Sequence, residues 1–319
     1  FNVAVAAADP ANCVPENLPS PPKGRTIVVG AGKASAKMAK IVEENWIGKI
    51  SGLVVTQYGY GIECNKIKII EAAHPVPDFS GLEATKKIFQ LAKSLKKDDM
   101  MLALFSGGGS ALLTMPVDGI TLSDKQKIIK SLLHSGASIA EINCIRKHLS
   151  KIKGGQLAKA ASKGVIVSLL ISDVVGNDPS TIASGPTVPD QSTFSEAKKI
   201  LNFYKINVPP RIVNHLESAV EETPKPENPL FLKNDVRVIA VPNQSLKAAA
   251  KVGEKLGFSI HCLGDHIEGE SRLVGQEHAQ LALACKKGLG PVKPPCILLS
   301  GGETTVSISG KGRGGPNTE

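Results

Sequence analysis

The chain has 319 residues, a formal net charge of +9 and an apolar fraction of 42%, which is ordinary for a globular protein. This length supports a sizeable core and two domains, and no apolar run approaches the roughly 18 residues that a membrane span requires. The basic residues are scattered along predicted helices, without a basic tail or an aromatic-interleaved patch. The charge therefore favours a small acidic substrate, and we expect neither a nucleic acid nor a membrane as a partner.

The cysteines and the N-terminus bear on the cellular compartment. The six cysteines stand singly, with no Cys-x-x-Cys pair and no Cys/His cluster, which favours free thiols in a reducing compartment over a zinc site. The first residues show no basic n-region and no cleavage site, so we expect no signal peptide. Together these features predict a cytoplasmic protein.

Short apolar runs alternate with longer amphipathic stretches, which is typical of βαβ units on a mostly parallel sheet. Strands are expected at 26–29, 53–56, 67–71, 100–105 and 165–171. Helices are expected at 33–44, 80–95, 123–134, 139–161, 195–204 and 210–222, with an interruption at Gly154-Gly155. Ser80 and Glu83 have the spacing of a capping box. The strand at 100–105 carries no charge, so we expect it to be central.

A proline-rich segment, Pro224-Lys225-Pro226-Glu227-Asn228-Pro229, marks the main domain boundary, because it can neither continue a helix nor lie in a central strand. We expect a Rossmann-like domain over 1–228, with helices on both faces of its sheet, and a smaller α/β domain over 229–319. The second domain should contain strands at 236–241, 259–263 and 297–300 and helices at 246–256 and 273–286. Its glycine-rich end predicts that further sequence follows.

The first candidate site is the turn Gly30-Ala31-Gly32-Lys33-Ala34-Ser35. A strand that runs through glycines into a helix start offers backbone N–H groups to an anion, and Lys33 adds a positive charge. The turn departs from the dinucleotide fingerprint, because its third position is Ser35 and the next strand ends in Thr56-Gln57 without an acid for a ribose hydroxyl. Phosphate binding is therefore the hypothesis, and a tight turn with a solvated lysine is the alternative.

The second candidate is Ser106-Gly107-Gly108-Gly109-Ser110, directly after the central strand. Adjacent glycines are costly unless the backbone adopts unusual angles or a ligand approaches closely. With a serine at each end, this segment predicts a nest-like loop for an anionic group. A plain turn is the alternative.

The third candidate is an acid beyond the strand at 165–171. Asp173 lies at the carboxyl end of the predicted sheet, where open α/β folds bind ligands, and it could hold Mg²⁺ or accept a hydroxyl proton. A helix cap or a turn is the alternative reading. Asp178, before Pro179, is a second candidate metal ligand and is equally typical of a turn.

Two further candidate sites contain charged residues. Arg146 and Lys147, with Lys151 and Lys153, form either an anion site or a solvated helix face. Near the C-terminus, Gly301-Gly302-Glu303 follow the last predicted strand, and Glu303 could bind a ribose or a metal. Arg313, among glycines, could reach a transferring phosphate with its bidentate fork. His74 is interpreted as structural.

These motifs, taken in order, resemble the glycerate 2-kinase family, whose C-terminal part is called the MOFRL domain. The resemblance rests on Gly30-Ala31-Gly32-Lys33-Ala34-Ser35, His74-Pro75-Val76-Pro77-Asp78, Ser106-Gly107-Gly108-Gly109-Ser110-Ala111-Leu112-Leu113, Asn143 with Ile145-Arg146-Lys147, Lys153-Gly154-Gly155, Ser172-Asp173-Val174, Ala183-Ser184-Gly185-Pro186-Thr187, Ser300-Gly301-Gly302-Glu303-Thr304 and Gly312-Arg313-Gly314-Gly315. Asn317 also matches the family's pattern, whereas Pro316 stands where the family usually has arginine.

The resemblance implies transfer of the γ-phosphoryl group of ATP to D-glycerate, with Mg²⁺, in the cleft between two α/β domains of a monomer or homodimer. By motif, Lys33 would contact the transferring phosphate or the glycerate carboxylate, and Asp173 would act on the attacking hydroxyl or the metal. Arg313 would stabilise the transition state, and the loop from Ser106 to Ser110 would cradle an anionic group. The alternatives are an NAD(P)H-dependent hydroxypyruvate reductase and a non-catalytic anion-binding module.

Overall fold

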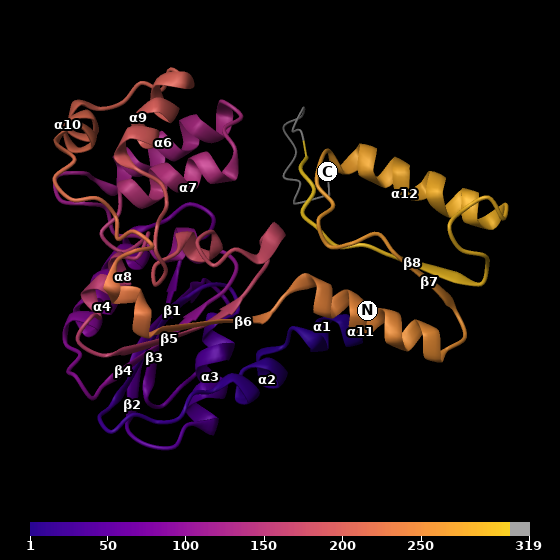
Figure 1. The fold of residues 1–319 in the computed structure, drawn as a ribbon, viewed down its shortest axis with the longest axis horizontal. Helices are drawn as coiled ribbons and strands as arrows, with labels where there is room; N and C mark the ends of the chain where they lie inside the picture. The colour runs from indigo at the N-terminus through magenta and orange to yellow at the C-terminus, as the bar shows by residue number, and fades with distance from the viewer. Residues whose placement is uncertain (307–319) are drawn as a thin grey trace. The chain divides into compact units, whose positions relative to one another are not determined.

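The computed structural model describes residues 1–306, which divide into two compact units (Figure 1). The larger unit is the continuous segment Val14–Ile239, and the smaller unit combines Phe1–Cys13 with the segment that begins at Ala240. No helix within residues 1–306 has the length and apolarity needed to cross a membrane.

A six-stranded sheet forms the centre of the larger unit, in the order β3-β2-β1-β4-β5-β6. Its strands are β1 Thr26–Ala31, β2 Ile50–Gln57, β3 Ile67–Ala72, β4 Met100–Phe105, β5 Val165–Ile171 and β6 Asn234–Ala240. The first five pair in parallel, and every residue of β1 and β4 is buried. The predicted α/β class, the mostly parallel sheet and the central position of the strand at 100–105 are therefore confirmed.

Helices cover the sheet and form a separate bundle. The helices of the larger unit are α3 Ser35–Asn45, α4 Phe79–Lys93, α5 Gly109–Leu112, α6 Leu122–His134, α7 Ile139–His148, α8 Gln156–Ala160, α9 Phe194–Phe203 and α10 Pro210–Ser218. Helices α4 and α8 share a buried core with alternate residues of the strands, whereas α3 contacts β1 and β2 without joining that core. Helices α6, α7, α9 and α10 pack around a second apolar cluster away from the sheet (Figure 1).

Local signals explain the helix ends. Helices α6, α7 and α9 each begin with a capping box, Thr121 with Asp124, Ser138 with Glu141 and Thr193 with Glu196. The helical stretch expected over 139–161, with an interruption at Gly154-Gly155, contains two helices. Helix α7 already ends at His148, and α8 begins directly after Gly154 and Gly155, which both adopt positive φ. The capping box expected at Ser80 and Glu83 is wrong: Asp78 caps α4 and accepts a hydrogen bond of 3.0 Å from the Gly81 N–H.

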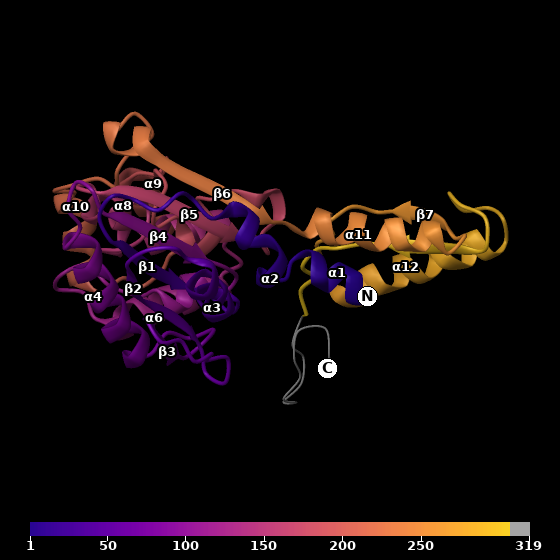
Figure 2. The same cartoon turned by 90° about the horizontal axis from the view of Figure 1, so that it is seen from below.

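The smaller unit contains the parallel pair β7 Ser259–Cys262 and β8 Cys296–Leu299, with helices α11 Pro242–Lys255 and α12 Ser271–Lys286. The first helix of the chain, α1 Asn2–Ala7, is followed by α2 Pro10–Cys13 and packs against α11, as both views show (Figure 2). Segments from the two ends of the described chain therefore build one unit.

The division of the chain differs from the boundary expected at 228/229. The strand expected over 236–241 joins the main sheet as β6, next to β5, and the larger unit extends to Ile239. The proline-rich segment interrupts helical structure, but local sequence does not determine which sheet the following strand joins. Residues 1–13, expected in the first domain, belong to the smaller unit.

Candidate functional site

Three turns meet at the carboxyl ends of β1, β4 and β5. These strands are neighbours in the sheet and run parallel, so the segments that follow them emerge at the same edge. The turns contain Lys33, the Ser106–Ser110 segment and Asp173, which sequence reasoning had selected separately. The structure therefore brings the first three candidate sites together.

The Gly30 turn is closed by the protein itself. The backbone N–H of Lys33 donates to the Gly107 carbonyl at 2.8 Å, and that of Ala34 donates to the Ser106 hydroxyl at 3.1 Å. The N–H of Gly32 donates to the Val55 carbonyl, and a Cβ atom on Gly32 would lie 2.1 Å from Ser106 Oγ. Glycine is thus required for the close approach of two turns.

Gly30 has a similar packing role inside β1, where a Cβ atom would lie 2.3 Å from the Leu104 carbonyl oxygen. The N–H groups that the sequence hypothesis assigned to a phosphate at Gly30 and Gly32 already serve the fold. The turn instead presents the Lys33 side chain, which is exposed. Recognition of an anion at this turn therefore falls to the ammonium group.

The Ser106–Ser110 turn has unused donors. The backbone N–H groups of Gly107, Gly108 and Ser110 have no acceptor within residues 1–306. The hydroxyl of Ser106 is buried and bonded to Ala34 and Ser35, and the hydroxyl of Ser110 is 2.8 Å from that of Ser184. An anion at this turn would therefore meet peptide N–H groups and no free hydroxyl, which is the chemistry of a nest.

Three ionisable side chains surround this turn. A Cβ atom on Gly107 would lie 1.9 Å from Asp173 Oδ2, so the carboxylate rests directly on the glycine backbone. A Cβ atom on Gly108 would lie 2.9 Å from His74 Nε2 and 3.4 Å from Lys33 Cγ. The arrangement places one ammonium, one imidazole and one carboxylate around a set of free N–H groups.

His74 is the residue whose position sequence reasoning missed. Burial lowers the pKa of its imidazole, the nearby Lys33 ammonium lowers it further, and Asp173 acts in the opposite direction. The ring is therefore neutral at pH 7 and able to accept a proton. The available signal was its place just beyond a strand of the parallel sheet, at the same edge as Asp173.

The two candidate metal ligands differ in their surroundings. Both carboxylate oxygens of Asp178 accept hydrogen bonds from Ser180, at 2.8 Å from its N–H and 2.6 Å from its hydroxyl, which is an Asx-type turn. Residues 1–306 contain no group of three His, Cys, Asp or Glu side chains that could cage a metal. Mg²⁺ in nucleotide sites is usually held by one or two carboxylates plus phosphate oxygens, which the exposed Asp173 fits and Asp178 does not.

The basic residues near α7 do not form a solvated face. Lys147 is 8% exposed, and its Nζ lies 3.1 Å from Oδ1 of the buried Asp190. Thr223 donates to the other oxygen of Asp190. This ion pair gives Lys147 a structural role, and the anion-binding role expected from sequence stays a prediction.

Arg146 is linked to the Ser106–Ser110 turn by hydrogen bonds. Its guanidinium donates to Asn143 Oδ1 at 3.2 Å, and the same oxygen accepts from the Ser184 hydroxyl at 3.1 Å. The Ser184 hydroxyl is bonded in turn to Ser110. A continuous polar chain thus joins Arg146 to the end of the Ser106–Ser110 turn.

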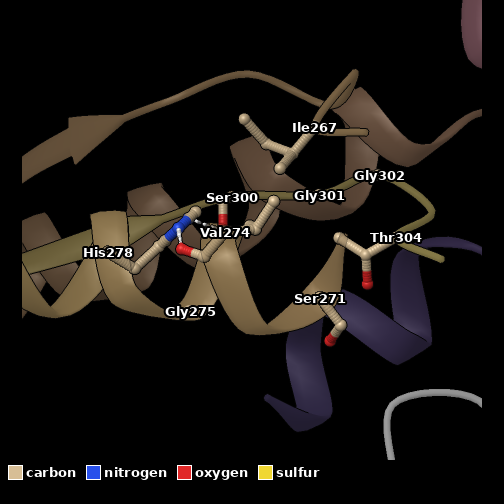
Figure 3. Close-up of a pocket in the computed structure, with 9 residues that line it drawn as sticks. All are labelled: Ile267, Ser271, Val274, Gly275, His278, Ser300, Gly301, Gly302 and Thr304. Carbon is tan, nitrogen blue, oxygen red and sulfur yellow. Dashed lines mark hydrogen bonds between the residues drawn. The ribbon is translucent and has the colours of Figure 1, made fainter. Parts of the chain in front are cut away.

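The fifth candidate lies in the smaller unit. Gly301 and Gly302 line a hollow of about 340 Å³ at the carboxyl end of β8, beside the start of α12 (Figure 3). His278 bridges its wall, with Nδ1 2.8 Å from the Val274 carbonyl and Nε2 3.0 Å from the Ser300 hydroxyl. Glu303 is exposed and is not among the lining residues. Arg313 and Asn317 lie outside the described residues.

Comparison with known proteins finds relatives that carry two functional names. Residues 1–217 match a family model described as a domain of unknown function, DUF4147. The chain is 42% identical to a glycerate 2-kinase of Pyrococcus horikoshii, covering 93% of the chain and 68% of the relative. It is 48% identical to a putative hydroxypyruvate reductase of Agrobacterium vitis, covering 100% and 73%. A solved glycerate kinase structure from Thermotoga maritima superposes with a TM-score of 0.84 at 35% identity, covering 99% of this chain and 76% of that one.

Proposed function

The chain belongs to the glycerate kinase family, and from this premise we propose that it transfers the γ-phosphoryl group of ATP to the 2-hydroxyl of D-glycerate. The products would be 2-phosphoglycerate and ADP. The observation that carries the proposal is the meeting of Lys33, His74 and Asp173 around a turn with free backbone N–H groups. Phosphoryl transfer depends on positioning and charge neutralisation more than on covalent chemistry, and this set supplies both.

Each side chain has a role that its surroundings permit. The Lys33 ammonium neutralises charge on the transferring group, and the N–H groups of Gly107 and Gly108 position an anionic oxygen beside it. As the glycerate oxygen bonds to phosphorus and the bond to ADP breaks, the hydroxyl proton passes to Asp173 or His74. Both acceptors lie against the same turn.

Mg²⁺ fits Asp173, whose exposed carboxylate abuts the turn. When bound, the ion would neutralise phosphate oxygens. A carboxylate engaged by a cation is a poor proton acceptor, and in that case the neutral imidazole of His74 takes the hydroxyl proton. The two side chains therefore divide the tasks that the family resemblance assigns to Asp173 alone.

We propose that Gly301, Gly302, Glu303 and Asn317 take part in binding substrate or phosphate, and that Arg313 stabilises the transferring phosphoryl group. The resemblance to the family supports these roles, and Gly301 and Gly302 also line a hollow. Arginine suits the last task because its planar fork can bind two phosphate oxygens at once.

The second candidate function is reduction of hydroxypyruvate, which the names of the two Agrobacterium vitis relatives favour. Dinucleotide binding uses the free N–H groups of the first glycine turn to hold a pyrophosphate. In this chain those of Lys33 and Ala34 are bonded to Gly107 and Ser106. The turn therefore lacks the donors that a dinucleotide would need there, and the kinase is the better-supported function.

A paired assay on the full-length protein separates these functions. We expect ADP release that depends on D-glycerate and Mg²⁺, and a product that enolase consumes directly because it is the 2-phosphate. Hydroxypyruvate should cause no oxidation of NADH or NADPH. NAD(P)H oxidation without glycerate-dependent ADP release would contradict the kinase proposal.

A further inference from the structure

Three basic side chains lie close to one another near the Ser106–Ser110 turn, and none has a carboxylate partner among residues 1–306. Lys125, from α6, is 5% exposed, and Lys153, between α7 and α8, is fully buried. The third is Arg146 of α7, and within the described chain none of the three is in an ion pair. Burial strongly lowers the pKa of Lys153, and the positive charges of Lys125 and Arg146 lower it further, so the three groups act on one another.

The donors of this cationic cluster are largely unused. Nζ of Lys125 has no hydrogen-bond partner in residues 1–306. Among the described residues, Nζ of Lys153 reaches only the Ala183 carbonyl, at 3.3 Å, and the Arg146 guanidinium reaches only Asn143. Burial of a charged basic group without a counterion is strongly unfavourable, so an anion bound among these three groups would stabilise their protonated forms.

Two contacts connect the cationic cluster to the candidate active site. Ala183, whose carbonyl accepts from Lys153, lies beside the turn, because a Cβ atom on Gly109 would be 2.8 Å from the Ala183 Cβ. The polar chain of Ser110, Ser184 and Asn143 ends on Arg146. Ala183 alone therefore separates Lys153 from the turn that Asp173 and His74 surround, and Asn143 and Ser184 separate Arg146 from it.

We propose that Lys125, Arg146 and Lys153 bind the carboxylate of the 2-hydroxy acid substrate, and that the substrate hydroxyl points toward Asp173. This inference rests on the proposed function. In D-glycerate the carboxylate is attached to the carbon that bears the reacting hydroxyl, so its binding site must adjoin the phosphoryl-transfer site. Three convergent cationic donors match the two oxygens of a carboxylate.

The central test is Lys125→Met, which removes the charge and keeps most of the side-chain length. The KM for D-glycerate should rise at least about tenfold while kcat changes little, because the carboxylate is held equally in the ground state and the transition state. Preference for D-glycerate over glycerol, which lacks the carboxylate, should fall with it. Lys127→Met, at an exposed position of the same helix, is the matched control and should keep the wild-type KM.

Thermal unfolding supplies a second readout. Ligand-free Lys125→Met should melt no lower than the wild type, because it loses an unpartnered buried charge, and it should lose the rise in Tm that D-glycerate causes. In the unaltered protein D-glycerate should raise Tm, whereas glycerol should not and sodium sulfate should do so only weakly. A wild-type KM in Lys125→Met, its failure to fold, or an equal Tm rise with sulfate would each overturn the inference.

The outcomes also separate this inference from the proposed function. A wild type that phosphorylates D-glycerate, combined with an unaltered KM in Lys125→Met, rejects the carboxylate site and keeps the kinase. A wild type without kinase activity that still binds D-glycerate or hydroxypyruvate through Lys125 rejects the kinase and keeps the site. Binding is therefore measured on the same preparations as turnover.

Discussion

Lys33 has a fixed backbone and an exposed side chain at the candidate active site. Its backbone is fixed by the Gly107 carbonyl, while its ammonium has no partner in residues 1–306. Lys33→Ala should therefore lower kcat on the order of 10²-fold or more, with Tm unchanged, because the group neutralises charge only in the reaction. Steady-state kinetics and thermal unfolding check this, with Lys87→Ala, on the exposed side of α4, as the control. Near-normal turnover would remove Lys33 from the mechanism.

Asp173 and Asp178 offer an internal comparison between two nearby carboxylates. Asp173→Asn should lower kcat at least about 10²-fold, because the amide neither accepts a proton nor binds Mg²⁺ well. Asp178→Asn should keep turnover and cost a little stability, since both oxygens of Asp178 serve the turn with Ser180. The prediction is tested by measuring kcat and Tm for both variants. Equal losses of turnover would give Asp178 a share in the chemistry.

The lowered pKa of Lys125 makes the free energy of unfolding depend on pH. Burial, assisted by the charge of Arg146, lowers its pKa from 10.5 to about 7 in the folded protein. Below pH 7 both states are protonated and the folded state bears the cost of the buried charge. Between about pH 7 and 10.5 the unfolded state binds a proton that the folded state lacks, so this group makes stability rise with pH.

Without ligand, Lys125→Met should therefore be more stable than the wild type near pH 6, and the difference should shrink as the pH approaches about 10. Lys153 acts in the same direction, because burial, assisted by the charges of Lys125 and Arg146, lowers its pKa in the folded protein. Denaturant unfolding at several pH values measures the difference. A variant that is less stable than the wild type at every pH would show that Lys125 has a counterion in the folded protein.

At the scale of elements, the pair of Lys147 and Asp190 ties α7 to the segment before α9. Lys147→Met leaves Asp190 buried and without its cation, which should destabilise the protein by about 3–5 kcal/mol. The double variant with Asp190→Asn should recover part of this loss. Urea unfolding gives the free energies, and the KM for D-glycerate should stay near the wild-type value. A raised KM without loss of stability would return Lys147 to the anion site.

The sequence predicted which segments form most of the helices and strands, because apolar periodicity and caps are local signals. Prediction from the sequence was wrong or incomplete where a residue contacts a partner that is distant in the sequence. The Gly30 turn was interpreted as a phosphate nest, but its N–H groups are taken by Ser106 and Gly107. Lys147 was open to interpretation as solvated because Asp190 lies beyond the next helix and strand. Lys125, between Asp124 and Gln126, sits in a polar stretch with no sign of burial.

Which sheet a strand joins was harder to predict than the presence of the strand itself. A half-buried strand such as β6 has the same pattern whichever sheet it joins, and its hydrogen bonds to the main sheet follow from tertiary packing alone. Site residues were predictable where they directly follow strands, as Lys33 and Asp173 do. His74 was missed because a proline-rich turn is usually structural, and its position becomes informative only once β3 is placed in the sheet.

At the scale of the whole molecule, the smaller unit depends on residues 1–13. Removing them should expose the face of α11 that α1 covers and accelerate amide hydrogen exchange over 242–255. Exchange in the buried strands β1 and β4 should not change, since both belong to the larger unit. Hydrogen exchange read by mass spectrometry reports both regions in one experiment. Unchanged protection of α11 would mean that α1 adds no stability there.

The split of the smaller unit also determines the order in which the chain can fold during synthesis. The larger unit is one continuous segment and can fold once Ile239 has left the ribosome. Helix α1 packs against α11, and at roughly 5–20 residues per second α11 is translated on the order of ten to fifty seconds after α1. Residues 1–13 therefore lack their partner α11 while the six-stranded sheet folds, and the smaller unit can assemble only after the larger one has been synthesised.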